Sequence, residues 1–207
     1  MDSTESIPDS EPLPPEVEAL FESALAKETG PGIAAWRTTW SWVVAVMALS
    51  VLGWLTFTRD GWVPLLSNVD FGVHEFGHMI MMWAPGPVSA LAGSAAQVLA
   101  PLGLAAYFLW RRDLFASTLM TGWAASSLNN VSVYIYDATR LQLSLWGDVD
   151  GTSAGHDWAN ILTKLKLIPH TDAITYAMRG LSVALFAGAL GLAVWGFVRA
   201  RSAQRPA

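Results

Sequence analysis

The chain has 207 residues, of which 53% are hydrophobic and only 14% are charged, and it contains 11 Trp. This composition is typical of a membrane protein and not of an ordinary soluble domain. The net charge of -5 describes one end of the chain, because about half of the 17 acidic residues precede Gly30, where Lys27 is the only basic residue. The sequence lacks a basic patch for nucleic acid. Because it has no cysteine, it also excludes disulfides and thiolate metal sites.

Residues 1–35 are predicted to form an acidic, partly disordered tail. Residues 1–13 are mainly Ser, Asp, Glu and Pro, a composition typical of disorder. From Pro14 to Glu28, apolar residues recur at helical spacing with acidic residues opposite them, which predicts a short amphipathic helix. Gly30-Pro31-Gly32 ends it. The acidic face argues against docking on anionic lipid.

The rest of the chain predicts an all-α fold, a polytopic membrane helical bundle over residues 36–200. One segment of this bundle carries the candidate metal-binding motif described below. We expect about five hydrophobic segments, with four to six as the range, because a membrane-spanning helix needs about 20 mainly apolar residues. The segments are residues 41–57, 62–84, 88–110, 114–135 and 173–198. Residues 201–207 are expected to form a C-terminal tail.

The second segment contains the motif His74-Glu75-Phe76-Gly77-His78. On a helix, residues four apart share a face, so His74 and His78 can bind one zinc ion. Glu75 can then act as general base for the water molecule that the zinc activates. The simpler alternative is a pair of histidines hydrogen-bonded inside a helical bundle. Ionisable residues within apolar segments are costly, however, and mark functional sites.

A catalytic zinc has three protein ligands and one open position. His156 is the first candidate for the third ligand, because its neighbour Asp157 offers a carboxylate that can orient the ring. Asp137 at the end of the fourth segment is the second candidate, and Asp157 itself is the third. His170, just before the last segment, is expected at the membrane interface. The predicted zinc ligands are therefore the two motif histidines and His156.

Other polar residues also have possible roles. They lie in the connection between the fourth and fifth segments (residues 139–169) and in the apolar segments themselves. Asp157 is expected in the first turn of a short helix, where an acidic residue is favoured. Gln97 either bonds a neighbouring helix or faces the metal cavity. Asn129 or Asn130 can donate a hydrogen bond to a developing oxyanion, or can bond another helix.

The His-Glu-Phe-Gly-His sequence within a hydrophobic segment resembles the site-2 protease class of intramembrane zinc metallopeptidases. In that class the two histidines and the glutamate lie on one membrane helix, and an aspartate on a later helix is the third ligand. Asp137 stands in a comparable place, although Ala138 follows it where the class has glycine. Three further motifs resemble small uncharacterised bacterial membrane proteins related to that class. They are Gly93-Ser94-Ala95-Ala96-Gln97 with Pro101, Tyr134-Ile135-Tyr136-Asp137-Ala138, and His156-Asp157-Trp158.

The resemblance implies a membrane-embedded zinc metallopeptidase with Zn²⁺ as cofactor, Glu75 as the catalytic residue, and a place in the bacterial cytoplasmic (inner) membrane. Its partners would be the lipid bilayer and a membrane protein or peptide as substrate. The alternative is a non-catalytic membrane subunit whose structural or vestigial metal site helps it bind a larger membrane complex. A carrier of metal or haem with an axial histidine is a third hypothesis, which no haem attachment motif supports.

Overall fold

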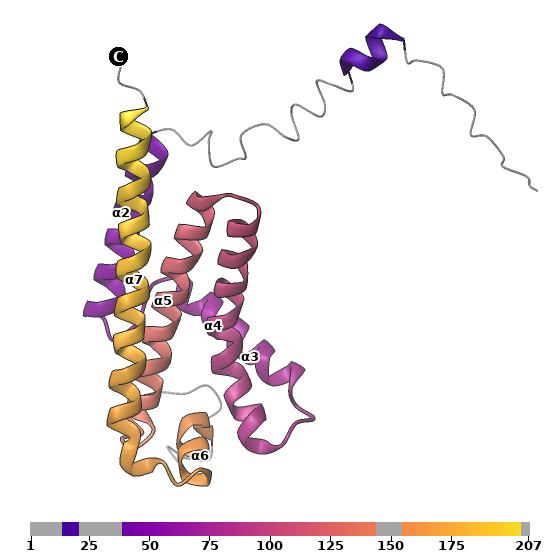
Figure 1. Ribbon diagram of the computed structural model, residues 1–207. Helices are drawn as coiled ribbons and strands as arrows, with labels where there is room; N and C mark the ends of the chain where they lie inside the picture. The colour runs from indigo at the N-terminus through magenta and orange to yellow at the C-terminus, as the bar shows by residue number, and fades with distance from the viewer. Residues whose placement is uncertain (1–13, 21–38, 144–154, 204–207) are drawn as a thin grey trace, which may run out of the picture.

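The computed structural model describes residues 14–20, 39–143 and 155–203, and within these ranges it contains helices and no strand (Figure 1). Residues 15–20 form a short helix at the N-terminal end. The remaining elements are α2 (Thr39–Thr58), α3 (Leu66–Ile80), α4 (Gly86–Trp110), α5 (Leu114–Asp137), α6 (Asp157–Lys164), the 3₁₀ helix η3 (Ile168–His170) and α7 (Thr171–Ser202). The all-α expectation is therefore confirmed.

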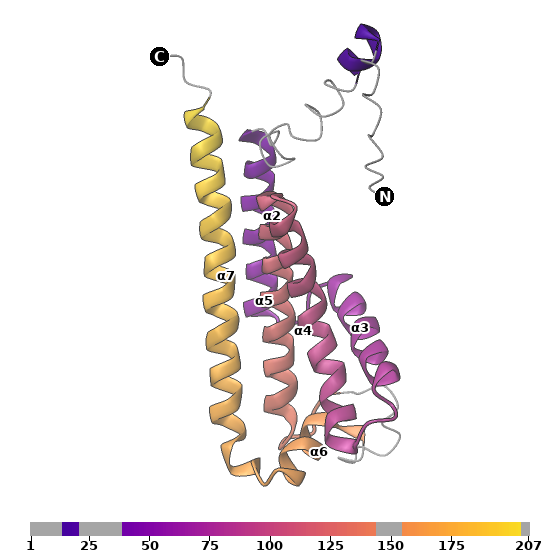
Figure 2. The same ribbon diagram turned by 45° about the vertical axis from the view of Figure 1, so that its right-hand side comes forward.

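Helix α5 is the centre of the bundle, because it packs against α2, α4 and α7. Helix α3 packs on the outer side of α4, and α6 lies across the end of the bundle that is farther from the C-terminus (Figures 1 and 2). Trp42, Leu49 and Phe186 belong to the core that joins α2, α5 and α7. A second core at the α6 end contains Ile135 and Leu162. This second core fixes α6 against α5.

All five predicted apolar segments form helices, namely α2, α3, α4, α5 and α7. Within the described residues, however, only three helical stretches are long and apolar enough to cross a membrane: Thr39–Thr58, Gly86–Trp110 and Ile168–Ser202. Helix α3 has 15 residues; at 1.5 Å per residue it extends about 22 Å, short of a hydrocarbon core about 30 Å thick. Helix α5 is long enough but carries many buried polar residues. The helical bundle is thus confirmed, but the described residues support three membrane spans and not the expected five hydrophobic segments.

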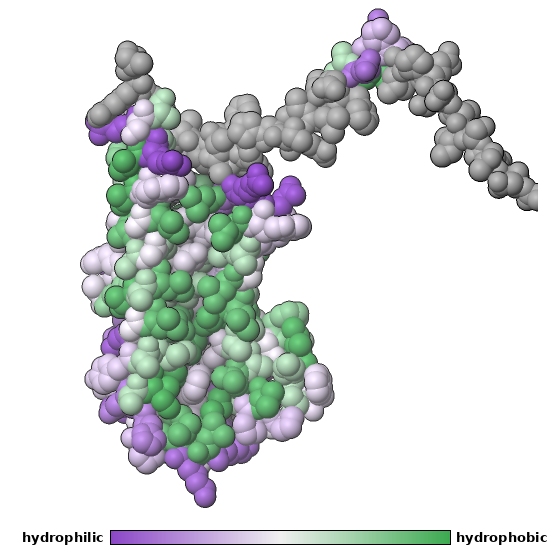
Figure 3. Space-filling view, viewed as in Figure 1, coloured by the Kyte–Doolittle hydropathy of each residue, from purple (hydrophilic) through white to green (hydrophobic). Residues whose placement is uncertain are grey.

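The surface of the bundle matches an apolar environment. Hydrophobic residues cover the face shown in Figure 3, and hydrophilic residues gather at its two ends. Helix α3 is the clearest case, because it buries Ser67, Asp70 and His74 and exposes apolar side chains on its outer side. Those exposed side chains include Phe71, Phe76, Met79 and Ile80. A helix of a soluble protein has the opposite polarity, so these observations indicate a membrane protein.

The predicted tail lies largely outside the described residues. The expected amphipathic helix over residues 14–28 is described only as far as residue 20, and its described side chains are exposed. The expected disorder of residues 1–13 and most of the C-terminal tail also lie outside the described ranges.

Close approach of α3 to α4 requires glycine at position 77, since a Cβ there would overlap the carbonyl oxygen of Ala92 and lie 2.7 Å from Cβ of Ala96. We expect Gly77→Ala to destabilise the bundle by about 1–3 kcal/mol, the usual cost of overpacking. Gly72 lies on the same helix with open space around its Cβ position. Gly72→Ala should stabilise α3 by up to about 1 kcal/mol through helix propensity. Thermal unfolding in detergent, followed by circular dichroism, measures both; equal effects would contradict the packing argument.

Candidate metal centre

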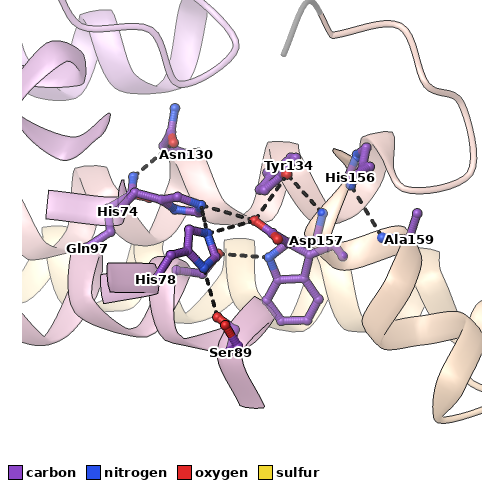
Figure 4. Close-up of polar contacts among 11 residues, drawn as sticks. His74, His78, Ser89, Gln97, Asn130, Tyr134, His156, Asp157 and Ala159 are labelled. Atoms are coloured by element: carbon purple, nitrogen blue, oxygen red, sulfur yellow. Dashed lines mark hydrogen bonds and ion pairs between the residues drawn. The ribbon is translucent and has the colours of Figure 1, made fainter. Parts of the chain in front are cut away.

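Three side chains meet at the α6 end of the bundle and present one ligand atom each to a common point (Figure 4). His74 Nε2 lies 3.2 Å from Asp157 Oδ2, and His78 Nε2 lies 3.1 Å from the same oxygen. The two Nε2 atoms are 3.0 Å apart. Among the described residues, this is the group of His, Asp and Glu side chains whose ligand atoms are close enough for one metal ion.

Helix geometry and one glycine place the two imidazole rings. His74 and His78 are four residues apart on α3, so both face α4. A Cβ at Gly93 of α4 would lie 2.5 Å from His78 Nε2 and 2.6 Å from His74 Nε2. The rings therefore occupy the space that a side chain at this position would fill. The motif helix and the glycine of the facing helix form one half of the site.

The Nδ1 atom of each ring contacts an oxygen atom. His78 Nδ1 lies 2.8 Å from the carbonyl oxygen of Ser89, and His74 Nδ1 lies 3.3 Å from Oε1 of Gln97. These oxygens are acceptors, so each Nδ1 donates its proton to them. In the neutral rings, the lone pairs at Nε2 then point at one another and at the Asp157 carboxylate. With both lone pairs facing the carboxylate, the three atoms form a group that could hold one metal ion.

Asp157 reaches the two histidines because α6 docks on α4 and α5. Trp158 Nε1 donates to Ser94 Oγ of α4 at 3.0 Å. The hydroxyl of Tyr134 on α5 accepts from the Asp157 backbone N–H at 3.1 Å and donates to Asp157 Oδ2 at 3.4 Å. Ile161 and Leu162 bury the other side of α6. The position of the carboxylate thus depends on both the hydrophobic core and hydrogen bonds.

The structure does not bring His156, the expected third ligand, to His74 and His78. His156 is fully buried at the N-cap of α6, where its Nδ1 accepts from the backbone N–H of Ala159 at 3.3 Å. Its Nε2 faces Asp137 Oδ2 at 3.4 Å, and its ring stacks on Tyr134 with centroids 4.4 Å apart. The capping bond turns the ring away from the cluster. Asp157, the third-ranked candidate, occupies the place expected for His156.

Asp137, the second candidate, is also outside the cluster. Its carboxylate accepts from the backbone N–H groups of Gln142 and Leu143, at 2.8 and 3.2 Å, and so holds the chain after α5. Burial lowers the pKa of His156, and the neighbouring Asp137 partly opposes that shift. The pair therefore has a structural role at the base of α6. His170 is exposed, just before α7.

Glu75 lines a cavity of about 560 Å³ beside the cluster. The same cavity is lined by His74, His78, Gln97, Asn130, Tyr134 and Asp157, with Arg59, Asp60 and Trp62 from the connection before α3. Glu75 is exposed to this space. A second, more open cavity of about 490 Å³, lined by Met79, Met82 and Ser89, also reaches His78 and Asp157. The cluster is accessible from two sides.

Of the remaining polar candidates, Gln97 and Asn130 line the larger cavity, whereas Asn129 is buried against α2. Gln97 fulfils both of its expected roles, since it contacts His74 and also donates to Asn130 Oδ1 of α5 at 2.9 Å. Asn130 lines the larger cavity. Asn129 is buried against α2, where its Nδ2 donates to the carbonyl oxygen of Thr56 at 3.0 Å. Of the two asparagines, only Asn130 therefore lies where a substrate could reach it.

Sequence reasoning gave too low a rank to Asp157 and missed Tyr134 and Gly93. Nothing in the sequence reverses the order of His156 and Asp157, because aspartate is a preferred N-cap residue and histidine is not. In the structure, however, His156 caps α6 and Asp157 is the first residue of the helix. Tyr134 and Gly93 likewise carry no signal, because their contacts with the site join different helices.

The fold and the site define a class: an all-helical membrane-type bundle with a two-histidine, one-aspartate cluster and a glutamate beside it. No family model, curated protein or solved structure matches the chain.

The hydroxyl of Tyr134 makes both of its described hydrogen bonds with Asp157. Tyr134→Phe keeps the ring that stacks on His156 and removes these bonds, so we expect a loss of about 0.5–1.5 kcal/mol in stability. Tyr136→Phe is the matched control, because Tyr136 is exposed on the same helix; its effect should stay within about 0.5 kcal/mol. Unfolding midpoints in detergent measure both variants. Equal midpoints for the two variants would show that the hydroxyl does not hold α6.

Proposed function

We propose that the protein is a membrane-embedded zinc metallopeptidase that hydrolyses peptide bonds in or near the bilayer, with His74, His78 and Asp157 as zinc ligands and Glu75 as general base. The observation that carries the proposal is the convergence of two Nε2 atoms and one carboxylate oxygen within 3.2 Å of one another. Glu75 lies next to this point in the same cavity.

The donor set fits zinc in both chemistry and spacing. Two histidines and one carboxylate are an established ligand set for catalytic zinc, with a fourth position left open. With zinc–ligand bonds of about 2.0–2.1 Å, tetrahedral geometry separates ligand atoms by about 3.3 Å. The observed separations of 3.0, 3.1 and 3.2 Å are close to this value. The acceptors at both Nδ1 atoms are the partners that zinc-binding histidines usually have.

The chemistry follows from the residues around the cluster. Zinc at this place would lower the pKa of a water molecule and polarise a peptide carbonyl. The Glu75 carboxylate would accept a proton from that water as the water oxygen bonds to the carbonyl carbon, and would pass the proton to the amine as the C–N bond breaks. Among the described residues no hydrogen bond or ion pair holds the Glu75 carboxylate, which is therefore free to move a proton. Asn130 lines the same cavity and can contact the substrate there.

The surroundings favour a substrate from the membrane. We include α3 and α5 as membrane-embedded helices besides the three long apolar ones: α3 because its outer side is apolar, and α5 because its neighbours enclose it. A peptide that reaches the cluster must then unwind close to the bilayer, since a helix hides its own backbone carbonyls. The resemblance to bacterial membrane proteins supports a location in the bacterial cytoplasmic membrane.

The ligand set predicts different metal contents for two neighbouring variants. Asp157→Ala should lose most of its bound zinc, because it removes one of three ligand atoms. His156→Asn should keep a full equivalent, since asparagine replaces the N-cap and the residue lies outside the cluster. Elemental analysis of the purified full chain measures both. Full zinc content in Asp157→Ala would remove Asp157 from the ligand set, and loss in His156→Asn alone would restore His156 as the ligand.

The role of Glu75 predicts a separation of catalysis from metal binding. Glu75→Gln keeps size and polarity but cannot accept the proton, so we expect hydrolysis to fall by about 10²- to 10⁴-fold. Zinc content should not change, because Glu75 is not a ligand. A quenched-fluorescence peptide library with an apolar central segment, presented in detergent or liposomes, measures the rate. Zinc binding with equal rates in the wild-type and variant proteins would favour the non-catalytic subunit.

A further inference from the structure

A chain of hydrogen bonds leads from Gly61, in the turn before α3, to His74. Figure 4 shows its part from Asn130 to Gln97 and His74. Asn130 Nδ2 donates to the carbonyl oxygen of Gly61 at 3.4 Å. Gln97 Nε2 donates to Asn130 Oδ1 at 2.9 Å, and Gln97 Oε1 lies 3.3 Å from His74 Nδ1. We call these four residues the amide relay. Gln97 is only 4% exposed, so water does not replace its partners.

Every amide in the relay must donate towards Gly61 and accept from the side of His74, because Gly61 offers only a carbonyl oxygen. A backbone carbonyl can only accept, so Asn130 must present its amide nitrogen to Gly61 and its oxygen to Gln97. Gln97 must then present its nitrogen to Asn130 and its oxygen to His74. The oxygen requires a proton on His74 Nδ1. The Asp70 carboxylate also interacts with the Gln97 side chain and favours the same orientation. The carbonyl of Gly61 and the carboxylate of Asp70 thereby favour the proton on Nδ1 of His74.

The backbone at Gly61 is suited to this role. Its φ of 77° is in the left-handed region, which favours glycine. A Cβ there would also lie 3.0 Å from Cα of Asn130. Both features let the carbonyl approach α5 closely enough to serve as the end of the relay.

The tautomer matters because an alternative acceptor lies on the other side of the ring. Asp157 Oδ2 is 3.2 Å from His74 Nε2 and can accept a proton from it. In that tautomer the ring has no lone pair at Nε2 and cannot ligate a metal ion. The relay therefore favours the ring proton of His74 at Nδ1, whereas Asp157 favours it at Nε2.

We propose that Gln97 and Asn130 are positioning residues that hold His74 in its metal-binding tautomer, with the Gly61 carbonyl as the fixed end of the relay. The proposal rests on the proposed zinc site and adds the residues that prepare one of its ligands. His78 needs no such relay, because its Nδ1 donates directly to the Ser89 carbonyl.

The first test changes Gln97 in the detergent-solubilised full chain and measures zinc affinity by competition with a chelator. Gln97→Leu removes the acceptor, and we expect zinc binding to weaken by about 10- to 100-fold, as for other outer partners of metal ligands. Gln97→Glu keeps an acceptor for His74 and should bind zinc as well as the wild-type protein does. Unchanged affinity in Gln97→Leu, or equal loss in both variants, would overturn the proposal.

The second test asks whether Asn130 acts through Gln97. Asn130→Leu leaves Asp70 as the remaining acceptor for the Gln97 amide and should weaken zinc binding less than Gln97→Leu does. Asn130→Asp still accepts from Gln97 and should not weaken it. In the double variant Gln97→Leu/Asn130→Leu, the second change should cost nothing further, because the relay is already broken. Asn129→Leu is the matched control and should leave zinc affinity unchanged. Additive losses, or an equal loss from Asn129→Leu, would indicate a general structural effect and overturn the relay.

A metal-free measurement separates this proposal from the zinc site itself. In protein with ¹⁵N-labelled histidine, with His74 assigned from a His74→Gln sample, the ring nitrogen shifts report the tautomer directly. We expect the proton at Nδ1 in the wild-type protein and in Gln97→Glu, and a shift towards Nε2 in Gln97→Leu. A wild-type protein that binds no zinc but shows these tautomers would refute the metallopeptidase and retain the relay. A wild-type His74 ring with its proton at Nε2 and none at Nδ1 would refute the relay.

Discussion

The convergence of three electron-pair donors is the constraint on which the site depends. His74 Nε2, His78 Nε2 and Asp157 Oδ2 lie 3.0 to 3.2 Å apart, close enough to hold one metal ion between them. The atoms that the two Nδ1 atoms contact, the side-chain oxygen of Gln97 and the backbone carbonyl oxygen of Ser89, are both acceptors and so direct the free lone pairs inward. Gly93 leaves the space that the rings need. The proposed metal ion would explain all three of these neighbours.

Polar residues gathered inside the bundle explain why the hydropathy of α5 is too low for a membrane span. Its polar residues bond to other helices: Ser126 to Thr56 of α2 at 2.8 Å, and Trp123 and Ser127 to the buried carboxylate of Asp70 at 2.7 and 2.9 Å. An unpaired polar group in an apolar environment costs several kcal/mol. Most buried polar side chains of α5 are therefore paired inside the bundle, whereas α3 exposes apolar side chains on its outside.

The two halves of the site have different origins. His74, Glu75 and His78 are arranged by one helix and need no other element to share a face. Asp157 reaches them only because Trp158, Ile161 and Leu162 of α6 bury themselves against the bundle. The hydrophobic core at the base of the molecule therefore supports the proposed metal site. We expect a change in that core that moves α6 to displace Asp157 from the two histidines.

The sequence by itself determined the five helices and the pairing of His74 with His78, because helical periodicity and the spacing of four residues are local properties of the chain. The tertiary structure decided the third member of the cluster. His156 and Asp157 are neighbours in sequence, and which of them faces the histidines depends on the N-cap bond of His156 and the docking of α6. It also decided which faces of α3 and α5 the other helices cover. Contacts between distant elements leave no periodic pattern in the sequence, so only the folded chain determines them.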